Sequence, residues 1–205
     1  MTSTEVTDQG LFPAEHRALR ELYATARHLE RHWSRLAGRL GAPAAVPLWA
    51  GAHAVGALLA ELDTRAATYR LHGFPAAVGA GGRLADARNA LGDLFLERNQ
   101  ALRLAVLDVQ HIRILLGYCA MLAETRGDAA LAEFHRRWET DLEDVEAGAR
   151  TAAIEQGRDP QGAIEPAQPG ALGRAGQRIG AAVGTAGEAI DASAAARAAR
   201  RLGGR

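Results

Sequence analysis

The sequence predicts an all-α protein whose main part is an antiparallel four-helix bundle with one long crossover connection. Apolar residues recur at alternating steps of three and four along most of residues 13–157, and the period-two alternation of strands is essentially absent. Four helix-length segments lie between glycine, proline and aspartate residues that begin or end helices. We expect residues 1–12 to be a disordered N-terminus, residues 158–171 a Pro/Gly linker and residues 172–205 a flexible tail.

The first expected helix begins near Pro13 and ends before Gly41. Proline suits the first helical turn, and the carboxylate of Glu15 is well placed for the positive end of the helix dipole. Apolar residues at bundle spacing form its core-facing stripe: Leu19, Leu22, Tyr23, Ala26, Leu29, Trp33, Leu36 and Leu40. The second expected helix begins at Pro47 and stops at Gly73, with the stripe Leu48, Ala52, Val55, Leu59, Leu62, Ala66 and Tyr69. The short loop between them predicts antiparallel neighbours.

Residues 76–82 are small and rich in glycine, and we interpret them as the connection to the second half of the bundle. A short helix over 84–95 is expected before the main third helix, 101–125. The core-facing stripe of that main helix would be Leu104, Leu107, His111, Ile114, Leu115, Tyr118 and Leu122. Asp128 is a natural N-cap for the fourth helix. The fourth helix presents Leu131, Phe134, Trp138, Leu142, Val145 and Ala149.

The tail over residues 172–205 is rich in alanine, glycine and arginine, with few large apolar residues. Each interior glycine costs a helix about 1 kcal/mol relative to alanine, so the sequence does not predict a stable isolated helix here. Two interpretations stay open. The tail is either a weak amphipathic helix that orders on a protein partner or a membrane surface, or a solvated segment.

The charge balance excludes a strong overall attraction to nucleic acid, because 24 basic and 24 acidic residues cancel. We therefore expect no nucleic-acid partner. The single cysteine, Cys119, excludes an internal disulfide, and its apolar neighbours predict a buried, inert thiol. The N-terminus lacks a secretory pattern, and no uninterrupted apolar run approaches the roughly 20 residues that span a bilayer, so we expect a cytoplasmic protein.

Four residues are candidates for a metal site inside the bundle. Carboxylate-bridged di-metal centres in such bundles need inward Glu residues from two helices and Glu-x-x-His pairs from the other two. The third helix offers His111, the fourth offers Glu139 and Asp141, and the first offers Glu30. This set is too small for a di-iron centre. We expect a degenerate site, with one iron or manganese ion as the alternative.

His111 also has a simpler interpretation, as a core histidine that is hydrogen-bonded to Tyr118, Tyr23 or an acidic group. The acidic run of residues 139–146 is interpreted as a solvated face on which only Asp141 lies close to the core stripe.

Other catalytic or metal-binding chemistry has little support in the sequence. His28 and His32 are at helical i,i+4 spacing and would suit a surface metal, but no neighbouring residue completes the ligand set. The chain has no phosphate loop, no His-Glu-x-x-His and no Gly-x-Ser-x-Gly elbow. An enzyme would therefore lack recognisable machinery.

Three segments resemble the ferritin-like bacterial stress proteins typified by YciE and YciF. The run from Leu19 to Leu29 resembles the opening helix of that family, Leu-x-Asp/Glu-Leu-Tyr-x-Ala-Glu-x-Gln-Leu. Residues 109–111, followed by residues 123–128, are similar to its Val-Glu-His helix and its Ala-Glu-x-x-Gly hairpin, and residues 69–73 to the end of its second helix. The resemblance covers about residues 13–155. It implies a ferritin-like fold, self-association and a link to stress.

The chain departs from the family at two ligand positions. Ala26 stands where the family's first helix has Glu, and Gln110 stands where Val-Glu-His has Glu. Replacing an inward Glu by Ala removes both a ligand and its charge, so a di-iron site does not carry over. The leading hypothesis is a non-enzymatic, stress-associated protein that forms a homodimer or larger oligomer, or docks a partner. The alternative is a metal-binding redox or storage protein of the same fold that uses His111 and nearby carboxylates.

Overall fold

The computed structural model describes residues 10–69, 96–171, 173–176 and 178. The helix expected over 84–95, most of the N-terminus and most of the tail lie outside these residues. The described chain is mostly helical and contains no β-strand; Glu97 and Pro166 form an isolated bridge. The all-α prediction is confirmed.

Four long helices dominate the structure, and two short elements follow them. The long helices are α1 (Pro13–Leu40), α2 (Ala45–Thr68), α4 (Arg98–Arg126) and α5 (Ala129–Glu155). The short elements are the 3-10 turn η1 (Gln156–Arg158) and the helix α6 (Pro160–Ala163).

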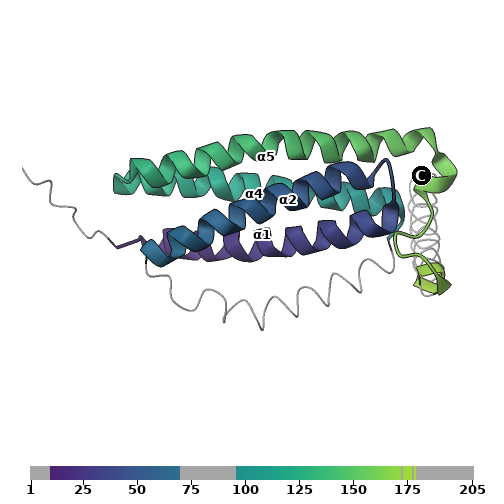
Figure 1. Ribbon diagram of the computed structural model, residues 1–205, viewed down its shortest axis with the longest axis horizontal. Helices are drawn as coiled ribbons and strands as arrows, with labels where there is room; N and C mark the ends of the chain where they lie inside the picture. Colours follow the sequence, from purple (N-terminus) through teal and green to yellow (C-terminus); the bar gives the residue numbers. More distant parts are fainter. Residues whose placement is uncertain (1–9, 70–95, 172, 177, 179–205) are drawn as a thin grey trace, which may run out of the picture.

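The long helices lie side by side along the long axis of the molecule (Figure 1). α1 packs on α2 and α4, while α5 packs on α4 and α2. The α1–α2 and α4–α5 pairs are both antiparallel, because only a few residues connect the two helices of each pair. The largest fully buried side chains between the helices are Trp33, Leu22, Leu29, Leu36, Leu48, Leu58, Leu102, Ile112, Leu116, Leu131, Leu142 and His135.

The helices of the first pair follow the sequence prediction closely. α1 begins at Pro13, and the Glu15 carboxylate accepts a hydrogen bond from the backbone nitrogen of Phe12 at 3.3 Å. Every residue of the expected α1 stripe is buried. α2 begins at Ala45, slightly earlier than the expected Pro47.

Gly51 allows α2 to approach α1 closely beside Trp33. A Cβ atom at Gly51 would lie 2.2 Å from Cζ3 of Trp33, whose indole is fully buried. Cores are packed too densely to absorb such an overlap without a shift. A larger residue at this position would displace the tryptophan or push the helices apart.

A glycine turn closes the second pair of helices. Gly127 has φ +84°, in the left-handed region that glycine adopts without steric cost. The backbone nitrogens of Gly127 and Asp128 donate to the carbonyls of Glu124 and Ala123, both at 2.9 Å. Asp128 caps α5 as predicted, since its carboxylate accepts from the backbone nitrogen of Leu131 at 2.9 Å. The expected α5 stripe is buried except for the half-buried Val145.

The side of α4 that faces the core is not the predicted one. Of the expected stripe, Leu115 is buried and Leu122 partly buried, whereas the exposed members are Leu104, Leu107, His111, Ile114 and Tyr118. The core side is formed instead by Ala101, Leu102, Ala105, Val106, Val109, Ile112, Leu116, Cys119, Ala120 and Ala123, together with Leu115. Both sides are apolar at helical spacing. The side rich in alanine turns inward, because small residues let α1 and α5 approach closely.

Residues 158–171, expected as a linker, are partly packed against the start of α4. The backbone nitrogen of Arg98 donates to the carbonyl of Glu165 at 2.8 Å, and that of Ala167 donates to the carbonyl of Leu96 at 2.9 Å. An ion pair of 2.9 Å joins the side chains of Arg98 and Glu165, and Ala167 is buried. The chain after α5 therefore returns to this end of α4.

Candidate functional site

An exposed apolar stripe runs along the outer side of α4. It consists of Leu104, Leu107, Ile114, Tyr118 and Met121, with His111 in the middle, and we call it the α4 stripe. Its apolar side chains are 45–69% exposed. The residues follow one another at alternating steps of three and four, the heptad spacing by which one helix packs along another. The α4 stripe thus has the geometry of a helix-packing seam, although the described helices leave it exposed.

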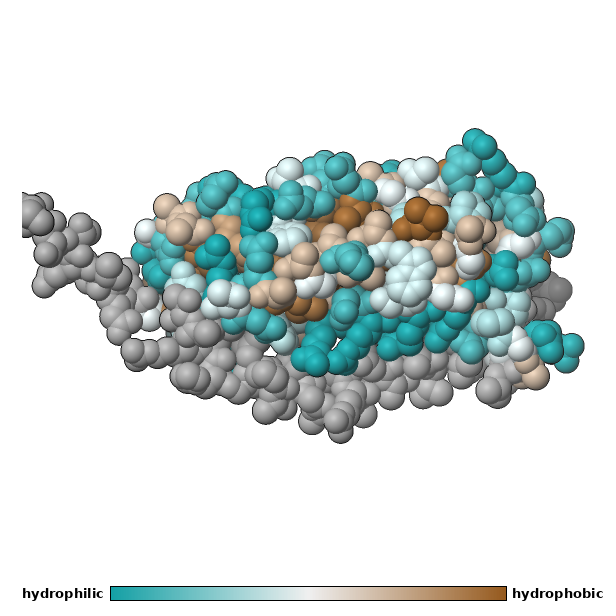
Figure 2. All heavy atoms as spheres, viewed as in Figure 1, coloured by the Kyte–Doolittle hydropathy of each residue, from teal (hydrophilic) through white to brown (hydrophobic). Residues whose placement is uncertain are grey.

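A smaller apolar surface lies on α2. Figure 2 shows apolar residues along the visible face of the molecule, over the band that α2 occupies, with hydrophilic residues below them. Its large exposed members are Val46 and Trp49, and several of the other exposed residues of α2 are alanines. The α4 stripe carries more large apolar side chains in a regular pattern, so it is the stronger candidate for an interaction surface.

α2 and α4 are also long and apolar enough to cross a membrane by length and composition, over Ala45–Arg65 and Arg98–Arg126. Neither segment is an uninterrupted apolar run. In each helix 39% of the apolar window is buried, and two helices of this kind are weak evidence of a membrane segment, since core helices and signal sequences pass the same test. Their high hydropathy reflects two apolar sides on one helix.

His111 lies in the α4 stripe and contacts α1. Its Nε2 atom is 3.4 Å from Oε1 of Glu21, and the two side chains are 50% and 56% exposed. The interpretation of His111 as a buried core histidine is therefore wrong. Its pairing with an acidic residue was among the expected contacts, but the pair is at the surface.

The structure does not gather the four candidate ligands around one point. Asp141 is exposed, and Glu30 and Glu139 are partly buried. Glu139 packs over Gly117 of α4. Among the residues that the structure describes, no group of three or more His, Cys, Asp or Glu side chains is arranged to hold a metal ion. A metal site that uses Glu30, His111, Glu139 and Asp141 stays a prediction.

His28 and His32, considered as a surface metal pair, are stacked on each other. Their ring centroids are 5.7 Å apart, and His32 is buried. The pair therefore belongs partly to the packing of α1.

The acidic run of α5 includes a partly buried partner for α4 that the sequence did not reveal. Glu146 accepts a hydrogen bond from Nε2 of Gln110 at 2.7 Å and pairs with Arg113. Arg113 also lies 3.4 Å from Glu143. Desolvation alone would raise the pKa of Glu146, but the hydrogen bonds from Gln110 and Arg113 outweigh it and lower the pKa. Glu146, not Asp141, is thus the inward acidic residue, and Gln110 helps to join α4 to α5.

A buried charged cluster joins all four long helices at one end of the molecule. Glu15 of α1 is fully buried, and Arg126 of α4 donates to both of its oxygens, from Nε at 2.9 Å and from Nη2 at 3.0 Å. Nη2 also donates to Oδ2 of Asp128 at 3.0 Å. The hydroxyl of Tyr69, which follows α2, donates to the same oxygen at 2.6 Å. We call these four residues the Glu15 cluster.

The contacts of the Glu15 cluster fix the charges of its members. The hydrogen bonds with Glu15 raise the pKa of Arg126 above its usual range. Desolvation opposes ionisation of Asp128, but hydrogen bonds from Tyr69, the Leu131 backbone and Arg126 lower its pKa. Burial, followed by the hydrogen bond with Asp128, raises the pKa of Tyr69. Because the charged groups are engaged with one another, the cluster is suited to holding helices together and not to proton transfer.

Two other buried titratable side chains lack the surroundings of a catalytic group. His135 is fully buried, and neither ring nitrogen has a hydrogen-bond partner among the described residues. Desolvation, followed by the positive charge of Arg65, lowers its pKa to about 4. Desolvation, with the charges of Glu15 and Glu21, raises the pKa of the Cys119 thiol to about 12. The predicted burial of this thiol is confirmed, and a thiol with such a pKa is a poor nucleophile.

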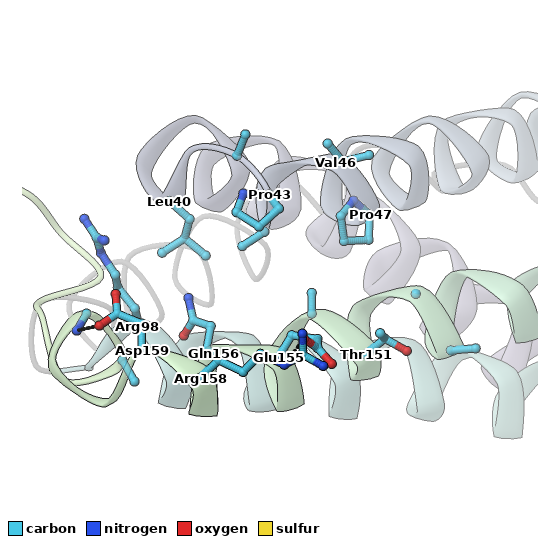
Figure 3. Close-up of a pocket in the computed structure, with 17 residues that line it drawn as sticks. Leu40, Pro43, Val46, Pro47, Arg98, Thr151, Glu155, Gln156, Arg158 and Asp159 are labelled. Atoms are coloured by element: carbon cyan, nitrogen blue, oxygen red, sulfur yellow. Dashed lines mark hydrogen bonds and ion pairs between the residues drawn. The ribbon is translucent and has the colours of Figure 1, made fainter.

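A cleft of about 1020 Å³ opens at the other end, between the α1–α2 connection and the end of α5 (Figure 3). Its apolar lining includes Leu40, Pro43, Val46 and Pro47. Its charged residues have partners: Arg98 pairs with Glu165 at 2.9 Å, Arg158 pairs with Glu155 at 2.8 Å, and Asp159 accepts from the backbone nitrogen of Gly162 at 3.0 Å. No set of charges converges in the cleft that would select a ligand.

Comparison with known proteins gives no match. No family model matches this sequence, and no curated protein or solved structure shows significant similarity to it. The resemblance to ferritin-like stress proteins therefore depends on the residues quoted above.

Proposed function

We propose that this chain is a non-enzymatic, ferritin-like helical protein, associated with bacterial stress, that acts through self-association or partner docking on the α4 stripe. The observation that carries the proposal is the stripe itself. Five large apolar side chains, with His111 in their middle, are exposed at heptad spacing on a helix whose other side already forms the core. Contiguous apolar surface of this kind typically marks an interaction site.

The course of the helices supports the ferritin-like part of the proposal. The hydrogen bond from Tyr69 to Asp128 brings the end of α2 to the end of α4, so the two helices run in parallel. The end of α2 and the start of α4 therefore lie at opposite ends of the bundle (Figure 1). A long crossover between the second and third helices is the connection that ferritin-like bundles use.

The non-enzymatic part is supported by the polar residues inside the helices. The Glu15 cluster and the Glu146 contacts join helices and engage the charged groups with one another. The metal-binding alternative depends on His111 and on the candidate carboxylates of Glu30, Glu139 and Asp141. Metal analysis of chain purified from cells supplemented with iron and manganese tests it. Stoichiometric metal that is lost in His111→Ala would favour the alternative over this proposal.

Association through the α4 stripe can be tested with a matched pair of variants. Ile114 on α4 and Ile154 on α5 are exposed to almost the same extent, 69% and 66%. We expect Ile114→Glu to dissociate the assembly, because the charge would be buried in an apolar seam, and Ile154→Glu to leave the mass unchanged. Size-exclusion chromatography with light scattering measures both. If Ile154→Glu dissociates the assembly and Ile114→Glu does not, the association surface lies elsewhere.

A further inference from the structure

We propose that the α4 stripe binds the α4 stripe of a second copy of this chain, with the two helices antiparallel and centred between Ile112 and Arg113. This inference rests on the proposed function, because it names the partner and the register for the same surface. It is carried by the order of the side chains, the charges at the two ends of the stripe and the area that the stripe offers.

The order of side chains makes the stripe complementary to itself when one copy is reversed. A two-fold axis at the stated centre places Leu104 opposite the partner's Met121, Leu107 opposite the partner's Tyr118 and His111 opposite the partner's Ile114. Each large apolar side chain then meets a residue of the other copy, and the contact closes on itself as a two-fold interface requires. Heptad spacing keeps both stripes in contact along their whole length.

A parallel arrangement satisfies the same residues less well. It would place His111 opposite the partner's His111, so that the two polar rings would face each other inside the apolar seam. In the antiparallel arrangement His111 faces an isoleucine and stays beside Glu21 of its own chain, 3.4 Å away. Opposed helix dipoles also favour the antiparallel pair.

Charged residues at the two ends of the stripe have opposite signs. Arg103 and Glu124 are both exposed and flank the stripe on the same side, one near each end. In the antiparallel pair each Arg103 lies beside the partner's Glu124, which gives two attractive contacts related by the two-fold axis. Glu124 already pairs with Arg136 of its own chain. Arg103 of the other copy would extend that pair at the rim of the interface.

The stripe is large enough for a dimer of moderate affinity. Residues 104–121 cover about 26 Å of helix at about 1.5 Å per residue. Five large side chains that are about half exposed offer roughly 400–500 Å² of apolar surface on each copy, at roughly 80–100 Å² each. Two copies would therefore bury roughly 800–1,000 Å² of apolar surface, at the lower limit for a specific interface. We expect a dissociation constant in the micromolar range.

Cysteine substitutions at the two ends of the stripe test the register. We would compare Leu104→Cys, Met121→Cys and the double variant under mild oxidation, with the wild-type chain as the baseline because Cys119 is buried. In the antiparallel pair the thiol at 104 lies opposite the partner's thiol at 121, so the double variant should form a covalent dimer. Positions 104 and 121 of one helix are about 26 Å apart, too far for a disulfide within one chain. In the antiparallel pair the same distance separates position 104 of one copy from position 104 of the other, and likewise for position 121.

The predicted result is a covalent dimer on a non-reducing gel for the double variant and for neither single variant. Equal cross-linking of the single variants would show a parallel pair and overturn the register, while self-association would stand. Association that is lost in Ile114→Glu, without cross-linking of the double variant, would likewise overturn the register alone. A wild-type chain that is monomeric at about 100 µM would overturn the dimer itself, because that concentration exceeds the expected dissociation constant. The next candidates to test for binding to the α4 stripe would then be a different protein or residues 70–95.

Loss of folding is distinguished from loss of association by the unfolding temperature of each variant. Should the double variant unfold, Leu107→Cys with Tyr118→Cys tests the same register at the next pair inward. In that pair too, the substituted positions are exposed.

Discussion

The two sides of α4 have similar apolar spacing but different surroundings. The inner side, with Val109, Ile112 and Leu116, is fully buried between α1 and α5, whereas the outer side, with Leu107 and Ile114, is exposed. The inner side also contains alanines that allow close helix packing. Apolar periodicity therefore identifies a helix, but residue size decides which of two apolar sides enters the core of one chain. We propose that the other side is left for contact between chains.

The sharpest test of this contrast places the same charge on each side of α4. Leu116→Asp would bury an unpaired carboxylate among the other helices and should cost more than about 4 kcal/mol, enough to unfold many domains of this size. Ile114→Asp, on the outer side, should change the stability of the monomer by less than about 0.5 kcal/mol. Urea denaturation followed by circular dichroism measures both. Equal destabilisation would mean that both sides are buried within one chain.

The ion pairs near the end of α4 show the same contrast. Arg126 is buried against Glu15, while Arg136 and Glu124 form an exposed pair. Arg126→Met leaves the Glu15 carboxylate buried without its partner and should cost about 3–5 kcal/mol of unfolding free energy. The matched control, Arg136→Met, should cost no more than about 1 kcal/mol. Thermal unfolding of both variants measures these costs. A larger loss of stability in Arg136→Met than in Arg126→Met would contradict the account.

The buried His135 extends the comparison to pH. His135 is buried and its pKa is lowered to about 4, whereas the unfolded chain binds the proton near pH 6.5. Between these values the unfolded state binds more protons, so the unfolding free energy should fall by about 3 kcal/mol as the pH drops from 6.5 to 4.

His135→Leu should flatten this dependence, because the buried ring that the unfolded chain protonates first is removed. Denaturation curves at several pH values measure the slopes. A slope that persists in His135→Leu would assign the dependence to other groups.

Substitution of two glycines of α2 by alanine should have the smallest effects on the unfolding free energy, and the two effects should be opposite in sign. Gly51→Ala places a Cβ atom 2.2 Å from Trp33 and should cost about 1–3 kcal/mol. Gly56 has no atom near the position of an added Cβ, so Gly56→Ala should stabilise the helix by up to about 1 kcal/mol. Thermal melts resolve this difference. Equal effects would mean that α2 does not approach Trp33 as closely as described.

The elements with local signals could be predicted from the sequence. Pro13 begins α1 and Asp128 caps α5 as expected, because each acts on the backbone of its own helix turn. The side of α4 could not be predicted, because both sides satisfy the helical period. The Glu15 cluster could not be predicted either, since Glu15 and Arg126 are 111 residues apart and only the packed helices bring them together.

The central claim is that the outer side of α4 joins two copies of this chain. Sedimentation equilibrium of the full-length wild-type protein, from about 1 to 100 µM, tests it most directly because this range spans the expected dissociation constant. The account predicts a mass that rises from 21.6 kDa toward twice that value. A mass that stays at 21.6 kDa throughout the range would contradict it.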